Sequence, residues 1–287
     1  MAGDLTVLFA FGALICWGVG DFFIQRCARK IGDLESLAYI GLIGVLGLLP
    51  FVAPEFHLLF SWRAAGSLVV LGIVTFIAAI LDFEALKKGK LAIVDLTFEF
   101  ELPVTIALGV LFFGDSLSVF QIFFIGMVFA GMILIAAKEF RHWKTKLEKG
   151  VLLAFAAAFF MGLVNYLTAS SSRSISPLIA IWGAWLVLTV MAFVMIGSRE
   201  GFRTFVKNGV RFRWIVLLMG IIDTAAWILY SHALFSNPLS ITTSITESYP
   251  AIALLLGVYV NKEKISWHQY AGAGIALAAS FLLSFTV

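Results

Sequence analysis

Charged residues are scarce in this sequence. Lysine, arginine, aspartate and glutamate together make up 13% of the 287 residues, whereas a soluble domain typically has about 25%. Hydrophobic residues make up 61% of the chain. This balance excludes an ordinary soluble globular protein and indicates an integral membrane protein. The apolar runs described below leave no room for a sizeable soluble domain beside them.

The sequence also lacks the patterns that most catalytic and metal sites require. Its two cysteines, Cys16 and Cys27, lie in or just after the first apolar run, and no metal-ligand spacing surrounds them. No nucleophile–base pair, glycine-rich phosphate loop or ATPase motif is present. We therefore expect no enzyme activity, no metal and no cofactor. The net charge of +3 gives no reason to expect a nucleic-acid partner.

Ten apolar runs are long enough to cross a bilayer as helices, because about 20 helical residues span its hydrocarbon core. They cover residues 5–24, 36–53, 65–86, 91–113, 118–137, 150–170, 177–197, 213–235, 239–260 and 267–286. The first run is longer than a signal-peptide core and no basic segment precedes it, so we count it as a helix of the mature protein. The sequence thus predicts an all-α, multi-pass membrane protein.

Basic residues are distributed very unevenly among the connections between these runs. The first, third, fifth, seventh and ninth connections hold 3, 3, 5, 5 and 2 lysines and arginines, and the other connections hold only Arg63 and Arg173. The positive-inside rule places the basic connections in the cytoplasm, which puts both termini outside.

The second half of the chain repeats the first. At an offset of 148 residues Glu99 matches Glu247, and at an offset of 144 residues Gly18 matches Gly162 and Asp21 matches Asn165. Two units of five spans follow from this register, at residues 1–137 and 150–287, joined by a cytoplasmic linker at 138–149. Because five is odd, the second unit enters the membrane from the opposite side, which makes an inverted repeat typical of secondary transporters.

Each half ends with the same series of features. The first half reads ELP…FFGDSLSVFQIFFIG, the second reads ESYP…VNKEKISWHQYAGAG, and the first half opens with CWGVGDFF. This pattern resembles the EamA-type repeat of the drug/metabolite transporter superfamily. The resemblance implies ten helices in two inverted five-helix repeats around a central cavity, alternating access, and substrates such as amino acids, sugars, nucleotide sugars, cations or drugs. Many members are thought to keep both termini in the cytoplasm, unlike the orientation that the basic residues favour here.

Eight acidic residues fall within the predicted spans, whereas the basic residue within these bounds is Arg213, at the very start of the eighth span. The acids are Asp21, Asp82, Glu84, Asp95, Glu99, Glu101, Asp223 and Glu247. A carboxylate is costly in hydrocarbon, so such residues face a protein interior or water and mark functional sites. Without basic partners they cannot all stay charged; they can carry protons or pair with a cationic substrate. Asp82, Glu84 and Asp95 lie near span ends, where reaching the interface is a sufficient explanation.

The repeat-related pair Glu99 and Glu247 is the favoured site. Glu99 lies about 12 Å along the fourth span, close to the middle of the bilayer. Glu101, matched by Tyr249, is a further candidate, but in a regular helix it points roughly 200° away from Glu99. Asp223 lies in the middle of the eighth span. Further candidate residues are Asp21 and its repeat partner Asn165.

Aromatic residues share helices or repeat positions with these acids and could hold a cationic group against their faces. The candidates are Trp17, Trp227, Tyr230 and Tyr249. Pro103 and Pro250 each remove a helical hydrogen bond and are predicted hinges. Gly126-x-x-x-Ala130 and Gly274-x-x-x-Ala278 are faces that would pack the fifth and tenth helices together, or serve a homodimer.

The sequence therefore predicts a secondary active transporter of small polar or cationic metabolites, such as amino acids or amines. We expect it to be proton-coupled, to work as a monomer or homodimer, and to lie in the plasma or inner membrane of a prokaryote. Alternatives are a sugar or nucleotide-sugar facilitator or exchanger of the same fold, or a passive channel.

Overall fold

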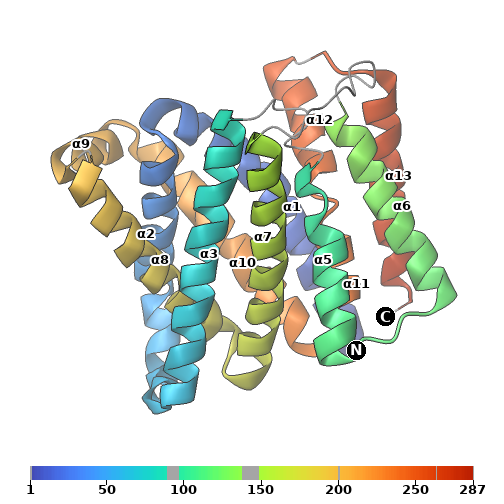
Figure 1. Cartoon of the computed structure of the whole chain (residues 1–287), viewed down its shortest axis with the longest axis horizontal. Helices are drawn as coiled ribbons and strands as arrows, with labels where there is room; N and C mark the ends of the chain where they lie inside the picture. Colours follow the sequence, from blue (N-terminus) through green and yellow to red (C-terminus); the bar gives the residue numbers. More distant parts are fainter. Residues whose placement is uncertain (1, 89–96, 138–148, 200, 263, 287) are drawn as a thin grey trace.

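A computed structural model describes residues 2–88, 97–137, 149–199, 201–262 and 264–286, and its regular secondary structure over these ranges is helical (Figure 1). The first half of the chain contains α1 (Ala2–Ile31), α2 (Asp33–Val52), the 3₁₀ helix η1 (Ala53–Phe60), α3 (Trp62–Lys88), α5 (Glu101–Leu108), the π-helical η2 (Gly109–Phe113) and α6 (Val119–Ala136). The predicted linker lies outside the described residues except for Lys149.

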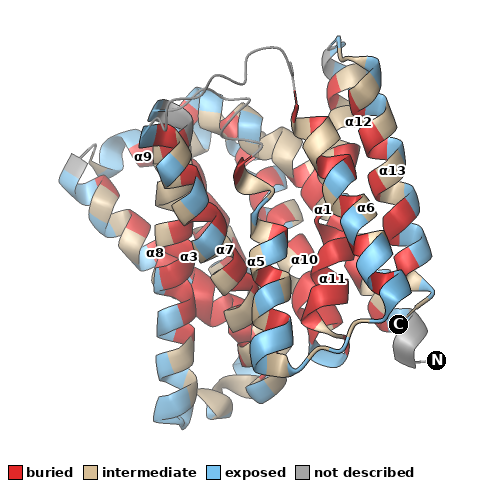
Figure 2. Cartoon of the chain, turned by 45° about the vertical axis from the view of Figure 1, so that its right-hand side comes forward, coloured by how far each residue is buried: buried red, intermediate tan, exposed pale blue. Residues whose placement is uncertain are grey.

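The second half contains α7 (Lys149–Ser174), α8 (Pro177–Arg199), α9 (Phe202–Arg211), α10 (Arg213–Ser236), α11 (Leu239–Thr246), α12 (Pro250–Asn261) and α13 (Trp267–Ser284). The long helices run side by side as a bundle, and both ends of the chain are marked near the lower end in Figure 1. Burial is most complete along α11, all of whose residues are buried, and α10 beside it also has a largely buried face (Figure 2).

Eight helical segments in the described part of the chain are long and apolar enough to span a membrane, fewer than the ten predicted. The predicted span at 91–113 is described only from Thr97, and its remainder holds the shorter apolar helix Glu101–Phe113. The predicted span at 267–286 forms α13, which has 18 residues but begins with the polar turn WHQY. The protein is thus a multi-pass, all-α membrane protein in which these two predicted spans differ from the others.

Helices of one half pack against helices of the other half in a repeated pattern. α1 packs against α10 and α12, and α7, the first helix of the second half, packs against α3 and α5. The second helices of the halves, α2 and α8, pack together, and so do the fifth, α6 and α13. These main contacts between the halves therefore occur in related pairs, as two related five-helix units would produce.

Two glycines show this repeated packing between the halves in atomic detail. A Cβ on Gly18 of α1 would lie 2.5 Å from Cβ of Ile252, and a Cβ on Gly162 of α7 would lie 2.6 Å from Cγ1 of Val104. Gly18 and Gly162 match at the offset of 144, while Val104 and Ile252 match at 148. Only glycine permits this close approach, so the sequence repeat corresponds to a repeated packing contact.

Small residues do bring α6 and α13 together, but they are not the predicted ones. Gly131 and Gly272 lie against each other: a Cβ on either would come within 2.7 Å of the carbonyl oxygen of the other. Gly126 and Gly274 have no atom within 4 Å of such a Cβ, and both are exposed. The predicted faces therefore point away from the contact between α6 and α13, since glycine spacing alone does not show which side of a helix is covered.

These two sites in one helix give a matched test of the packing. Gly131→Leu should lower the apparent unfolding temperature of the purified protein, because the new side chain meets the backbone of α13. Gly126→Leu, five residues earlier on the exposed side, should leave the unfolding temperature nearly unchanged. Equal losses in the two variants would contradict the packing described here.

Candidate functional site

Both repeat-related glutamates lie where a membrane helix is interrupted. Glu99 lies in a turn before α5, and Glu247 lies in the turn between α11 and α12. Pro250 begins α12 and Pro103 is the third residue of α5, so both prolines lie in the first turn of the helix that follows the break. A proline is well tolerated there because the first N–H groups of a helix have no partner within it. The prolines thus follow a broken helix, where we had predicted a bend within a continuous one.

Side-chain hydroxyls help to end α11 before Glu247. Ser244 Oγ donates to the carbonyl of Ser240 at 2.6 Å, and Ser248 Oγ donates to the carbonyl of Ile245 at 2.7 Å. The backbone then turns through bonds to the third preceding residue, such as Tyr249 N to Thr246 O at 3.0 Å. Local hydroxyl bonds of this kind compete with regular helix geometry. The serine- and threonine-rich stretch therefore permits the interruption that positions Glu247.

Four of the predicted acids interact electrostatically as one cluster drawn from both halves. Glu101 on α5 interacts with Glu247, and Glu247 interacts with Asp21 on α1. Asp21 also interacts with Asp223 on α10. Asp223 and Glu247 are buried, whereas Asp21 and Glu101 are half-buried. The structure thus brings together residues that lie up to 226 positions apart in the sequence, between Asp21 and Glu247.

Glu99 also belongs with this group. We had expected Glu99 and Glu101 to face in opposite directions, on the assumption of one regular helix. The turn at Glu99 and Phe100 removes that assumption, and both glutamates interact electrostatically with Glu247 and with Tyr249.

Asn165 connects α7 to this cluster. Its Nδ2 donates to Glu101 Oε1 at 2.8 Å and to Thr105 Oγ1 at 3.1 Å. Asn165 and Thr105 are buried, so the amide holds Glu101 in place from the opposite half of the chain. Asp21, the repeat partner of Asn165, makes no hydrogen bond or ion pair within the described residues, which leaves its carboxylate available to a ligand.

The four predicted aromatic residues lie beside the acids. The ring centroid of Trp17 is 5.1 Å from those of Trp227 and Tyr230 and 6.1 Å from that of Tyr249. Tyr249 interacts electrostatically with Asp21 and Glu247. Trp17 and Tyr230 are buried, and Trp227 and Tyr249 are half-buried. Aromatic faces next to carboxylates are suited to a cationic or amphipathic group.

No lysine or arginine forms an ion pair with Asp21, Glu101, Asp223 or Glu247 within the part of the chain that the structure describes. The basic side chain in this region is Arg173, which the sequence analysis placed outside the spans. It lies in the last turn of α7, donates to the carbonyls of Leu234 at 2.9 Å and Asn237 at 2.7 Å, and lies over the ring of Phe113. Its hydrogen bonds therefore go to backbone carbonyls at the end of α10 and just after it, and not to any of the four acids.

Arg173 has an acidic neighbour in the first half of the chain. Asp115 interacts electrostatically with Arg173, and its Oδ2 accepts from the backbone N and the hydroxyl of Ser240, each at 2.8 Å. This carboxylate from the first half thus caps α11 of the second half. Arg173 and Arg63 were the only basic residues in the basic-poor connections, a signal that could have singled out Arg173.

The other three acids differ from one another. Glu84 forms an ion pair with Lys88 at 2.8 Å, which agrees with its predicted place at a helix end. Asp82 interacts electrostatically with Glu101, closer to the cluster than expected. Asp95 lies outside the described residues.

Two buried polar atoms lie close together, one on Trp185 and one on Thr224, the residue that follows Asp223. Trp185 Nε1 and Thr224 Oγ1 have no hydrogen-bond partner within the described residues, and a Cβ on Gly44 would lie within 2.9 Å of both. The ring of Trp185 also contacts that of Trp227, at 5.4 Å between centroids. A buried donor and hydroxyl without partners leave bonding capacity for a bound polar group.

Apolar spanning helices around a polar interior built by both halves define a multi-pass membrane protein with a site for a small solute. Comparison with solved structures supports the fold: one crystal structure of a protein matches with a TM-score of 0.79 and 14% sequence identity, covering 98% of this chain and 96% of that one.

Sequence comparison then identifies the family. A profile of the EamA-like transporter family matches residues 4–137 and 148–285, so the chain belongs to that family. It is therefore a membrane transporter and, as expected, not an enzyme.

Individual relatives are distant. The chain is 23% identical to "Protein RarD" of Streptomyces exfoliatus, covering 97% of this chain and 87% of that protein. It is 21% identical to an "Uncharacterized transporter" of Archaeoglobus fulgidus, over 97% and 98%. An uncharacterized protein of Methanocaldococcus jannaschii is 22% identical over 134 residues, which is 46% of this chain and 97% of that protein. That relative is about half as long as this chain.

The bond between Tyr230 and Thr243 tests the packing of the site. Their hydroxyl oxygens lie 2.6 Å apart, and both side chains are fully buried. Tyr230→Phe or Thr243→Val alone should cost about 1–3 kcal/mol of stability, because each leaves a buried hydroxyl unpaired. The double variant should lose less than the sum of the two single losses, measured by equilibrium unfolding in mixed micelles. Additive losses would show that the two hydroxyls are not paired.

Proposed function

We propose that this protein is a secondary active transporter that exchanges a small cationic or polar metabolite, such as an amine or amino acid, for protons. The observation that carries the proposal is the group of four carboxylates contributed by α1, α5, α10 and the α11–α12 turn, without a basic partner among the described residues. Buried acids in a membrane protein are a default site for substrate or protons.

The charge of the cluster gives a physical reason for coupling substrate transport to the movement of protons. Four carboxylates near one another cannot all be ionised in a site of low dielectric constant, so positive charge must come from protons or from a cation. A cation that binds among the carboxylates lowers their affinity for protons, and bound protons lower their affinity for the cation. Competition for the same carboxylates is the minimum requirement for exchange, because one bound species then excludes the other.

The groups beside the acids suit a substrate that combines a positive charge with further apolar or polar groups. Trp17, Trp227 and Tyr249 offer aromatic faces next to Asp21 and Glu247. Such faces hold a cationic group with about 0.5–2 kcal/mol. The unpartnered Trp185 Nε1 and Thr224 Oγ1 offer a donor and a hydroxyl for a further polar group.

The interrupted helices support alternating access between two inverted five-helix repeats around a central cavity. In transporters built from such repeats, substrate sites form at broken helices near the middle of the membrane. Here the breaks fall at the repeat-related Glu99 and Glu247, next to Pro103 and Pro250, which we propose as hinges. Gly18 and Gly162, at the crossing points of the two halves, allow the helices to pack closely in each arrangement.

The basic residues set the orientation that we propose. The connections rich in lysine and arginine face the cytoplasm, and both termini face outward.

Transport in proteoliposomes tests the function. With a panel of radiolabelled amines and neutral amino acids, we expect uptake of at least one compound to follow an imposed pH gradient. Glu247→Gln should reduce that uptake by roughly tenfold or more, since it removes a charge from the cluster while keeping a similar shape. Glu84→Gln, at an exposed helix end, is the matched control and should transport normally.

Two results would contradict this proposal. Uptake that is indifferent to the pH gradient would exclude proton coupling and favour a facilitator or a channel. Normal gradient-driven uptake by Glu247→Gln would exclude the cluster as the coupling site.

A further inference from the structure

A short helix between two spanning helices takes no part in the acidic site described above. α9 (Phe202–Arg211) joins α8 to α10 at the edge of the bundle (Figure 1). Its sequence, FRTFVKNGVR, contains three basic residues and no acidic one. Arg203, Lys207 and Arg211 follow one another at intervals of four residues, so they form one stripe along the helix.

The protein fixes how α9 is rotated. The ring of Phe205 stacks on that of Tyr39 with 4.1 Å between centroids and 11° between planes, and the Tyr39 hydroxyl donates to the carbonyl of Phe205. Asn208 Nδ2 donates to Glu35 Oε2 at 2.8 Å. A Cβ on Gly209 would collide with the Tyr39 side chain, so this face of α9 lies directly on α2. The rotation of α9 about its own axis is therefore fixed, and so are the directions in which its other faces point.

An apolar stripe is presented away from α2. Phe202, Val206 and Val210, also four residues apart, are 49%, 59% and 66% exposed. Trp214, one turn further along the chain, is 70% exposed. The ring of Phe202 contacts that of Phe193 on α8, but the row as a whole is largely uncovered by the protein. Such a row of apolar side chains points to a surrounding that is not water.

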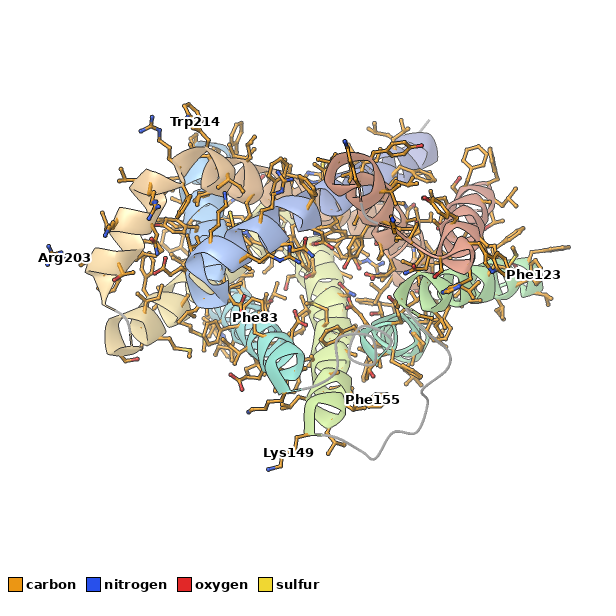
Figure 3. The ribbon with its side chains drawn as sticks, turned by 90° about the horizontal axis from the view of Figure 1, so that it is seen from above. Phe83, Phe123, Lys149, Phe155, Arg203 and Trp214 are labelled. Carbon is orange, nitrogen blue, oxygen red and sulfur yellow. The ribbon has the colours of Figure 1, made fainter. Side chains whose placement is uncertain are left out.

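The basic stripe lies directly beside the apolar one. Successive residues of a helix are about 100° apart, so Arg203, Lys207 and Arg211 follow next around the helix after Phe202, Val206 and Val210. All three basic residues are exposed, and Arg203 points away from the bundle in Figure 3. Arg203 and Lys207 form no ion pair within the described residues. The positive charge of this face is therefore available to an outside partner.

We propose that α9 lies in the plane of the membrane surface and binds the headgroups of acidic phospholipids. α8 and α10, to which it is joined, are both spanning segments, so α9 lies at the level where they leave the bilayer. The apolar stripe enters the boundary of the acyl chains, and the basic stripe meets lipid phosphates, as in other interfacial amphipathic helices. A soluble acidic protein would satisfy the charges but would leave the apolar stripe without a hydrocarbon partner.

A fluorescent reporter beside the helix can measure the local lipid composition. Trp214→Cys is labelled with bimane in the full chain carrying Cys16→Ser and Cys27→Ser, and the protein is reconstituted into nanodiscs. The discs contain equal amounts of phosphatidylcholine and phosphatidylglycerol, of which either one or the other carries bromine atoms on its acyl chains. Bromine quenches only nearby fluorophores, so the ratio of the two quenching values reports enrichment of the acidic lipid around α9.

We expect brominated phosphatidylglycerol to quench at least roughly twofold more than brominated phosphatidylcholine, and the difference to shrink at high salt. Arg203→Gln, Lys207→Gln and Arg211→Gln together should abolish the difference. Arg63→Gln, Lys262→Gln and Lys264→Gln remove the same charge from other exposed positions and should preserve it. Equal quenching by the two lipids in the parent protein, or equal loss in both triple variants, would overturn the proposal.

Discussion

Carboxylates that lie inside a membrane protein without a basic partner impose the main constraint on this structure. The interior holds Asp21, Glu101, Asp223 and Glu247 in one electrostatically connected group, and Arg173 donates its hydrogen bonds to backbone carbonyls. Such a group is costly unless protons, a cationic solute or water reach it. The proposed exchange would meet this condition, because each half of the transport cycle would supply protons or a cationic solute to the same site.

The architecture explains how the acids come together. Neither half could form the site alone, since α1 of the first half lies against α10 and α12 of the second, and α7 lies against α3 and α5. The equivalent contacts at Gly18 and Gly162 bring the first helix of each half against the fourth helix of the other. Movement of one half relative to the other must therefore change the surroundings of the acids. Under the proposed function, this geometry would couple a change in the arrangement of the halves to a change in the charge of the site.

Much of this arrangement was predictable from the sequence, because polar residues in apolar spans and register between halves are both visible there. Glu99 and Glu247 were paired by the offset of 148, and both lie at an interruption. The break itself was not predicted, since a proline in a helical pattern fits a bend as well as a new helix start. The prediction that Glu99 and Glu101 point in opposite directions assumed one regular helix through both residues. The backbone instead turns at Glu99 and Phe100, before α5 begins.

Other features depend on tertiary packing that periodicity cannot give. Gly126 and Gly274 have the spacing of a packing face, yet Gly131 and Gly272 make the contact, because helix rotation is set by all neighbours together. Arg173 was counted as a loop residue because the apolar run ends before it, but the helix continues for one more turn. The unpaired polar atoms of Trp185 and Thr224 could not be predicted from the sequence, because they are recognised only by the lack of hydrogen-bond partners within the described part of the structure.

Thiol accessibility inside the site tests the central claim most directly. Tyr249→Cys, in the chain with Cys16→Ser and Cys27→Ser, places one thiol beside Asp21 and Glu247 while all four acids remain. A positively charged methanethiosulfonate should react with this thiol roughly tenfold faster than a negatively charged one of similar size, because the acids attract cations into a wetted interior. Val190→Cys, on an exposed apolar position of α8, should react with neither. If the thiol at position 249 reacts with neither reagent, or faster with the anionic one, then the interior is not a water-accessible site for cations.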